Sequence, residues 1–422
     1  MRTLRRSRGS LRLLGGALLG LVLGLVLGLL LAGGHHWASS GASRPAAGPL
    51  PSSGAASATG PRPPPYPVAC GTSVCLGGAP MALVGTNAFG LATSREHNFG
   101  CGPQADDVDG LLQTLPRGAV VRVWAFQGLA RNPGTRSYDF GGLDRLFDAA
   151  ERAHVLLLPV LSDQTGTCDD GHWRDDAYYA GGYRQAFDDD GAGRAPAPFW
   201  EYLAAVVPRY AGSAALFGWE LVNEPQAARC SGGPRGSACY AALSCPVGAD
   251  TALRGFYDTV GARTRELDGH RHLLVMGVIG TGQCGANAGQ YAELLASPGV
   301  DVATYHDYGA EDDPLPTGLE ERLGMAAGLG KPLLVEEAGI TAGDPPGCRS
   351  GRSRALLLEA KAHAARRAGA IGLLPWNLQP GEQECGYDFG PQQMLRDRTV
   401  ALTAADPDAA GPQPARGSGR AG

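Results

Sequence analysis

The sequence lacks the patterns that most often reveal a metal centre or a nucleophilic serine. It has no Cys-x-x-Cys pair and no His-Glu-x-x-His, and its nine histidines follow no metal-ligand spacing. It has no Gly-x-Ser-x-Gly segment, so a serine hydrolase of the α/β type has no support. A Gly-x-Gly-x-x-Gly occurs at residues 280–285, but a dinucleotide site needs an acid that closes the next strand about 20 residues on, and Asp301 opens that strand instead. We therefore expect no metal and no cofactor.

Positive charge is scarce beyond the first residues. The formal net charge is −5 at pH 7, and the first 37 residues carry five arginines and no acid. Without those five positive charges, the remainder has a net charge of −10. Lysine occurs only at positions 331 and 361. A surface this acidic argues against a nucleic-acid partner.

The N-terminal segment predicts export. Residues 1–12 are basic, and residues 13–34 are an apolar run of Leu, Val, Gly and Ala. Such a run is either a signal peptide or a membrane anchor, since its 22 residues are enough to cross a bilayer. We assign residues 1–37 to this segment and expect an extracellular domain that is secreted or anchored to the membrane.

Low-complexity stretches flank the rest of the chain. Residues 38–66 are rich in Ala, Ser, Gly and Pro, which predicts an extended linker. Residues 404–422 are similar and are predicted to be disordered. Residues 67–403 remain for a catalytic domain.

Ten cysteines behind an export segment predict disulfide bonds. The candidate bridges are Cys70–Cys75, one within the group Cys230, Cys239 and Cys245, and Cys348–Cys385. The last of these would join the loops after two neighbouring strands.

Residues 67–403 alternate short apolar runs with helical patterns. The apolar runs are 81–86, 119–125, 155–161, 215–223, 272–278, 300–306, 332–337 and 370–376. The helical stretches are 105–115, 143–153, 200–210, 251–267, 290–295, 320–329 and 354–368. Continuously apolar runs are typical of parallel strands that are covered on both faces. Eight of them alternating with helices predict an α/β fold of the (β/α)8 TIM barrel type, with a doubly wound open sheet as the alternative.

Residues 216–225 are the most informative of these runs. Aromatic and branched side chains favour a strand, and Pro225 must end it because proline has no N–H to donate. Asn223 and Glu224 are therefore delivered to the carboxyl end of the strand, where barrel enzymes keep their catalytic groups. Glu220, inside the strand, would need a polar partner or an outward-facing position.

Polar and aromatic residues end the other strands as well. They are Asn87, Arg122, Trp124, His306, Tyr308, Glu337 and Trp376. Two acids from opposite sides of a barrel, Glu224 and Glu337, can flank one bond. Arg122 lies within an apolar strand and needs a carboxylate partner, because an unpaired buried charge is very costly. Paired carboxylates, flat aromatic faces for sugars and no cofactor motif together point to glycoside hydrolysis.

At these motifs the sequence resembles glycoside hydrolase family 5, the (β/α)8 family that includes endoglucanases and β-mannanases. The resemblance spans residues 81–377. It rests on Asn223-Glu224-Pro225, His306-Asp307-Tyr308, Glu337-Ala338-Gly339, Arg122 of the second strand and Trp376 of the eighth.

The resemblance implies a retaining mechanism with Glu224 as acid/base and Glu337 as nucleophile. Arg122 and Tyr308 would hold Glu337 ionised, and Asn223 would bind the sugar 2-hydroxyl. We expect a raised pKa for Glu224, because a second carboxylate lies nearby. Trp124 and Trp376 would stack on sugar faces, with His306 and Asn87 supporting the site. Neighbouring residues on a strand face opposite ways, which predicts that Glu336 does not enter the site.

The substrate is predicted to be a β-1,4-linked polysaccharide. Segments 85–88, 122–126 and 331–334 look most like the β-mannanase subgroup, so mannan is favoured and β-1,4-glucan is the alternative. A non-catalytic carbohydrate-binding barrel is a further alternative, which the presence of both acids disfavours. The loop 165–173 and the Cys-rich insert 230–245 depart from the subgroup and would reshape the sugar subsites. We expect a monomer.

Overall fold

The computed structural model describes residues 64–92, 107–132, 135–187, 196–231, 239–240, 242–309, 311–343, 347–379 and 385–391. All of them fall within the unit Pro61–Gly422. The predictions for residues 1–37, for the linker up to residue 63 and for the tail 404–422 concern segments outside the described residues.

Eight parallel strands close into a barrel. In chain order they are β4 (Gly85–Asn87), β5 (Val120–Trp124), β6 (Leu156–Val160), β7 (Gly218–Glu220), β10 (Leu273–Val275), β11 (Ala303–Asp307), β12 (Leu333–Ala338) and β13 (Gly372–Pro375). Strands β4 to β10 pair in sequence order, and so do β11 to β13. The bridges Val275–Val302 and Leu83–Gly372 join these two groups and close the ring. Every predicted apolar run overlaps one strand, and the TIM barrel is confirmed.

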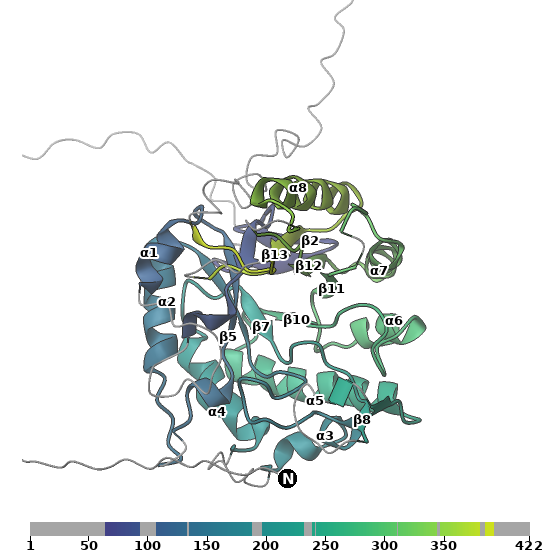
Figure 1. Cartoon of the computed structure of the whole chain (residues 1–422). Helices are drawn as coiled ribbons and strands as arrows, with labels where there is room; N and C mark the ends of the chain where they lie inside the picture. The colour runs from purple at the N-terminus through teal and green to yellow at the C-terminus, as the bar shows by residue number, and fades with distance from the viewer. Residues whose placement is uncertain are drawn as a thin grey trace, which may run out of the picture. The chain divides into compact units, whose positions relative to one another are not determined.

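Helices surround the strands (Figure 1). The predicted helical stretches correspond to α1 (Val108–Gln113), α2 (Gly141–Ala153), α4 (Phe199–Tyr210), α5 (Ala249–Asp268), α6 (Gly289–Leu295), α7 (Thr317–Gly328) and α8 (Gly351–Arg367). The sequence did not predict α3 (Asp176–Tyr179) or the 3-10 turns η1 (Phe89–Ala92), η2 (Gln127–Leu129) and η3 (Gly182–Arg184). A single turn is too short to show helical periodicity.

A small antiparallel sheet that the sequence did not predict precedes the barrel. It consists of β1 (Val68–Cys70), β2 (Ser73–Leu76) and β3 (Ala79–Pro80). Val74 is fully buried and packs in one cluster with Val120, Phe217 and Leu273, which lie at the amino ends of barrel strands. The sheet therefore closes the end of the barrel opposite to the predicted site.

Disulfide bonds tie the loops together. The pairs are Cys70–Cys75, Cys230–Cys239, Cys245–Cys284 and Cys348–Cys385, and Cys168 is also disulfide-bonded. Cys70–Cys75, Cys348–Cys385 and a bridge within the Cys-rich insert were predicted. The bond from Cys245 to Cys284 was not, because a separation of 39 residues gives no local signal. It joins the loop after β7 to the loop after β10.

The two lysines of the chain also make structural contacts. Lys361 on α8 is buried, and its Nζ donates to Asp307 Oδ2 at 2.8 Å. Lys331, just before β12, donates to three backbone carbonyls between residues 295 and 300. Both ammonium groups therefore hold loops and strand ends in place.

No helix in the described part of the chain combines the length and the apolar character that a membrane span needs. The predicted export or anchor segment at residues 13–34 lies outside that part.

We predict that Val74→Ala lowers the free energy of unfolding by about 2 kcal/mol, because it opens a cavity where the N-terminal sheet closes the barrel. Val247 is fully exposed, so Val247→Ala is the matched control and should change stability little. Urea denaturation of both variants measures this. Equal effects at the two positions would mean that β2 does not seal the barrel.

Candidate active site

The nine residues singled out from the sequence come together at the carboxyl ends of the barrel strands. They are Asn87, Arg122, Trp124, Asn223, Glu224, His306, Tyr308, Glu337 and Trp376. Hydrogen bonds and ion pairs link seven of them, and the two tryptophans pack against each other beside this network.

Glu224 and Glu337 face each other in this site. A carboxylate oxygen of Glu224 lies within 4.8 Å of one of Glu337. Retaining glycosidases keep their two carboxyl groups about 5–5.5 Å apart, whereas inverting enzymes need about 6.5–9.5 Å. The side chain of Glu337 is 4% exposed and that of Glu224 is 23% exposed. The pair thus combines a short separation with one sheltered and one accessible acid.

Two strong donors hold Glu337. Arg122 Nη1 donates to Oε1 at 2.5 Å, and the Tyr308 hydroxyl donates to Oε2 at 2.7 Å. The ring of Tyr308 lies against the backbone of Gly339, where an added Cβ would sit 2.2 Å from a ring carbon. Gly339 is therefore needed so that Tyr308 can reach the carboxylate, which gives the Glu-x-Gly motif a steric basis.

Arg122 is fully buried and organises the network. Its Nε and Nη2 donate to both oxygens of Glu220 at 2.7 Å, and Nη2 also donates to Asn223 Oδ1 at 2.7 Å. Its Nη1 donates to Asn87 Oδ1 at 3.1 Å as well as to Glu337. Glu220, whose position inside an apolar strand demanded a partner, is thus the bidentate partner of this guanidinium.

Glu336 departs from the sequence prediction, because it points into the barrel directly behind the site. Its Oε1 lies 3.1 Å from His306 Nε2, and its Oε2 lies 3.7 Å from Arg122 Nε. Tyr305 pairs in register with Val335, but His306 pairs with Glu337, so Glu336 is an extra residue in β12. Such a bulge breaks the alternation of side chains on which the prediction rested.

The backbone at Glu224 also interrupts the alternation of side-chain directions along the strand. Glu224 has a φ of 52°, in the left-handed region that side chains other than glycine adopt at a cost of roughly 1–2 kcal/mol. Its N–H donates to Gly277 O at 2.8 Å, and the preceding Asn223 donates from Nδ2 to Asp163 Oδ1 at 2.9 Å. This turn lets two consecutive residues, Asn223 and Glu224, both face the site.

His306 connects the acids. Its Nδ1 lies 2.8 Å from Glu224 Oε1, while Nε2 contacts Glu336. Burial lowers the pKa of His306, but the charges of Glu337 and Glu224 and the hydrogen bonds to Glu224 and Glu336 outweigh it and raise the pKa to about 10. The imidazole is therefore protonated at neutral pH, and it donates from both nitrogens.

The sequence predicted that the pKa of Glu224 is raised and that Glu337 is the ionised acid, but in the free site the two pKa shifts are the other way round. Burial raises the pKa of Glu337, although His306 and Arg122 oppose it. Burial also acts on Glu224, but the hydrogen bond and charge of His306 outweigh it and lower the pKa of that carboxyl. The expectation was wrong because it considered the second carboxylate and ignored the imidazolium between the two. In the free site, the proton next to Glu224 is on His306.

A cation does not suit these residues. Glu224, His306 and Glu337 are close enough together to ligate a metal. A metal ligand must be a neutral imidazole, however, so a cation would have to displace the proton that the raised pKa places on His306 in the free site. The guanidinium of Arg122 already compensates Glu337. The donor set therefore fits an uncharged substrate better than a metal.

An aromatic cluster borders the acids. Trp376 is half-buried and stacks on Phe89 with ring centroids 5.6 Å apart. Trp124 is only 7% exposed and lies 5.7 Å from Trp376, with the Arg122 guanidinium 4.9 Å from its ring centre. Trp376 is thus the more accessible of the two tryptophans, and the buried Trp124 packs against it.

Sequence reasoning did not assign roles to Asp163, Glu220 and Glu336. Each is buried and bonded to a residue of the site. The signal was present for Glu220 and Glu336, since an acid inside a continuously apolar strand must have a buried partner.

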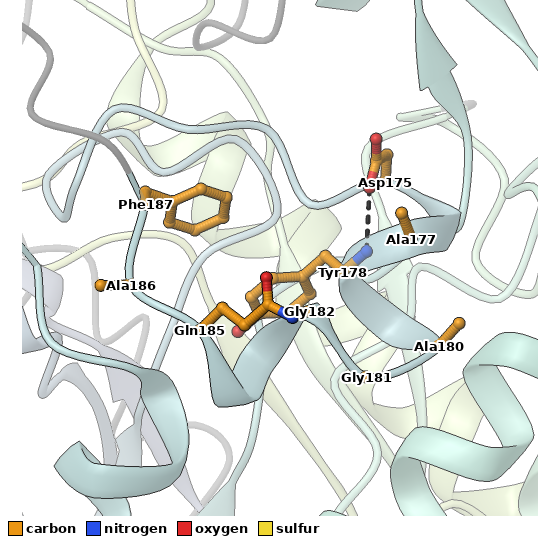
Figure 2. A pocket seen from close by; sticks show the side chains of 9 residues that line it. All are labelled: Asp175, Ala177, Tyr178, Ala180, Gly181, Gly182, Gln185, Ala186 and Phe187. Atoms are coloured by element: carbon orange, nitrogen blue, oxygen red, sulfur yellow. Dashed lines mark hydrogen bonds between the residues drawn. The ribbon is translucent and has the colours of Figure 1, made fainter.

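A hollow of about 510 Å3 lies beside α3 and η3 (Figure 2), and neither Glu224 nor Glu337 lines it. It is lined by residues of one continuous stretch, 175–187. Its one carboxylate, Asp175, caps α3 by accepting from Tyr178 N at 2.9 Å, as the dashed line in Figure 2 marks. The hollow therefore carries no catalytic chemistry.

We predict that Glu336→Gln flattens the pH dependence of stability. Folding raises the pKa of Glu220 from 4.5 to about 8, chiefly through burial, and that of His306 from 6.5 to about 10. Both groups bind protons more tightly when folded, so stability is lost as pH rises from 4.5 to 8 and from 6.5 to 10, respectively. Without the charge of Glu336, both pKa values fall, and the decline becomes shallower.

Urea denaturation across this pH range measures the slope. Glu359→Gln is the matched control, because Glu359 contacts His363 at 3.7 Å on the partly exposed face of α8. It should leave the slope as in the parent protein. An unchanged slope in Glu336→Gln would show that Glu336 does not support the charge of His306.

Comparisons with known proteins agree with this architecture. No family model matches the chain. The chain is 27% identical to the probable mannan endo-1,4-β-mannosidase A of Aspergillus oryzae over 303 residues, which cover 64% of this chain and 72% of the relative. It is 28% identical to mannan endo-1,4-β-mannosidase A of Emericella nidulans over 251 residues, 53% of this chain and 58% of the relative.

Solved structures share the fold. The endo-1,4-β-mannanase of Rhizomucor miehei superposes with a TM-score of 0.57 at 18% identity, covering 80% of this chain and 99% of that one. A broad-specificity endoglucanase of Clostridium longisporum gives 0.52 at 12% identity, covering 76% and 95%. The sequence relatives, the closed barrel and the motifs at its strand ends therefore agree in one result: this chain is similar to the β-mannanases of glycoside hydrolase family 5.

Proposed function

We propose that this glycoside hydrolase is a retaining endo-β-1,4-mannanase. The observation that carries the proposal is the carboxyl pair, with oxygens of Glu224 and Glu337 within 4.8 Å of one another. This separation supports attack by one carboxylate on the sugar, since it leaves no room for a water molecule between the acid and the bond. The sheltered acid, Glu337, is the nucleophile, and the accessible Glu224 is the acid/base.

In the first step, Glu337 attacks the anomeric carbon while the bond from that carbon to the leaving oxygen breaks. Glu224 gives its proton to the leaving oxygen. The substrate supplies the change in pKa that Glu224 needs, because a sugar over this carboxyl excludes water and desolvation favours the neutral acid. The protonated His306, 2.8 Å away, is a direct source of that proton.

In the second step, Glu224 as a carboxylate takes a proton from water. The water oxygen bonds to the anomeric carbon, and the bond to Glu337 breaks. Each displacement inverts the anomeric carbon, so after two displacements the product has the same anomeric configuration as the substrate. Asn223 assists by binding the sugar 2-hydroxyl: one hydrogen of its Nδ2 is used on Asp163, and the other is left for the substrate.

Mannan is the favoured substrate because the sequence relatives named above are mannan endo-1,4-β-mannosidases. β-1,4-Glucan is the alternative, since an endoglucanase shares the fold. A binding protein without activity would need the aromatic face of Trp376 but not two acids held by Arg122, Tyr308 and His306. The paired acids therefore favour catalysis over binding alone.

We also propose that the domain works outside the cell as a monomer, either secreted or tethered through residues 13–34. Its disulfide bonds support this location, because such bonds persist in oxidising compartments. A cytosolic protein that keeps residues 1–37 would contradict it.

Glu337→Ala should lower kcat on mannan by more than about a thousandfold, and azide should restore turnover with an inverted glycosyl azide as product. Glu224→Ala should still form the glycosyl-enzyme from activated aryl β-mannosides, because good leaving groups need no proton. Glu201→Ala, on the exposed face of α4, is the control. NMR that shows an inverted product from the native enzyme would overturn the mechanism.

A substrate series of mannan, glucomannan, xylan and carboxymethyl-cellulose decides the specificity, with released reducing ends as the measurement. We expect the highest kcat/KM on mannan or glucomannan. Good hydrolysis of carboxymethyl-cellulose without activity on either mannan would establish the glucanase alternative instead.

A further inference from the structure

Tyr240 is the one aromatic residue among the exposed large hydrophobic residues of the described chain, with 46% of its surface accessible. A single exposed hydrophobic side chain needs no explanation in general. The position of this one is unusual, because it belongs to the Cys-rich insert that follows the acid/base Glu224.

The insert is fastened on both sides of Tyr240. Strand β8 (Arg229–Cys230) begins five residues after Glu224 and pairs with β9 (Leu243–Ser244). The Cys230–Cys239 bond brings the residue before Tyr240 onto β8, and Cys245–Cys284 anchors the end of the hairpin to the loop after β10. The two bonds therefore tie the insert to β8 and to the loop after β10.

The ring of Tyr240 also rests on a rigid support. It packs against Trp173 in a T-shaped arrangement, with centroids 5.3 Å apart and planes at 90°. Trp173 is buried, and its Nε1 donates at 2.7 Å to the carbonyl of Ala228, four residues after Glu224. The next residue, Arg174, forms buried ion pairs with Asp169 and Asp170 at 2.9 and 2.5 Å. The loop after β6 and the insert after β7 thus fix Tyr240 together.

The acids of the site act electrostatically on the hydroxyl of Tyr240. The pKa of this phenol is raised, first by burial of the hydroxyl and then by the negative charges of Glu224, Asp163 and Glu337. The residue as a whole is 46% exposed. An aromatic side chain is therefore partly open to solvent on the insert that follows Glu224.

We propose that Tyr240 is a platform on which a pyranose ring stacks on the leaving-group side of the cleaved bond. This inference rests on the proposed function, in which Glu224 protonates the leaving oxygen. The sugar units beyond that oxygen must pass on the side of Glu224, where the insert presents the ring. The ligand is a β-1,4-linked hexose oligosaccharide long enough to extend past the site, and the platform adds affinity only for such substrates.

The test compares two substrates in Tyr240→Ala. An aryl β-mannobioside carries only an aryl group on the leaving side, whereas mannohexaose fills that side with sugars. We expect kcat/KM on mannohexaose to fall about tenfold and kcat/KM on the aryl substrate to stay within about twofold. Tyr240→Phe keeps the ring and should retain most of the activity on mannohexaose. Leu356→Ala, exposed on α8, is the control for removal of a surface hydrophobic side chain.

If Tyr240→Ala lowers kcat/KM equally on both substrates, or does not lower it on mannohexaose, Tyr240 is not a sugar platform. Binding to the inactive Glu337→Ala variant separates this proposal from the proposed function. Calorimetry with mannohexaose and cellohexaose should show weaker binding when Tyr240→Ala is added to that variant. If only cellohexaose binds, and binds through Tyr240, the platform stands and the mannan assignment fails. If neither binding constant depends on Tyr240, the platform is wrong whatever the substrate.

Discussion

The buried charge of Arg122 is the constraint on which the site depends. A guanidinium in a barrel interior is tolerated only when every donor has a partner, and here the partners come from three other strands or their ends: Asn87, Glu220, Asn223 and Glu337. Removal of the arginine would leave Glu220 buried without its bidentate partner, and loss of one partner of a buried ion pair typically costs about 3–5 kcal/mol, a large part of a domain's stability. The same bonds fix the orientation of Asn223 and Glu337. Stability and catalytic geometry therefore rest on one side chain.

His306 extends this network to the accessible acid. It holds a charge between Glu224, Glu336 and Glu337, so the buried Glu336 influences the proton that His306 carries beside Glu224. The two carboxylates cannot be considered without His306, because the imidazolium between them decides in which direction the pKa of each is shifted.

Much of the fold and the site could be predicted from the sequence, since buried parallel strands are continuously apolar and Pro225 marks where one of them must stop. The motifs then placed Glu224, Glu337 and Arg122 at the strand ends. The position of Glu336 could not be predicted, because a bulge depends on the pairing register and leaves no local signal. The direction of the pKa of Glu224 depends on His306, 82 residues away in sequence. The N-terminal sheet was missed because its strands are only two to four residues long.

The scarcity of lysine has a practical consequence for handling the protein. The ammonium group of Lys361 is buried against Asp307, and that of Lys331 is bonded to backbone carbonyls. Reagents that couple to surface amines, such as aldehyde or active-ester supports, would have to break these contacts to react with either side chain. Coupling through carboxyl groups is easier on so acidic a surface, but it exposes Glu224 to the same chemistry. A competing oligosaccharide kept in the site during immobilisation would shield that acid.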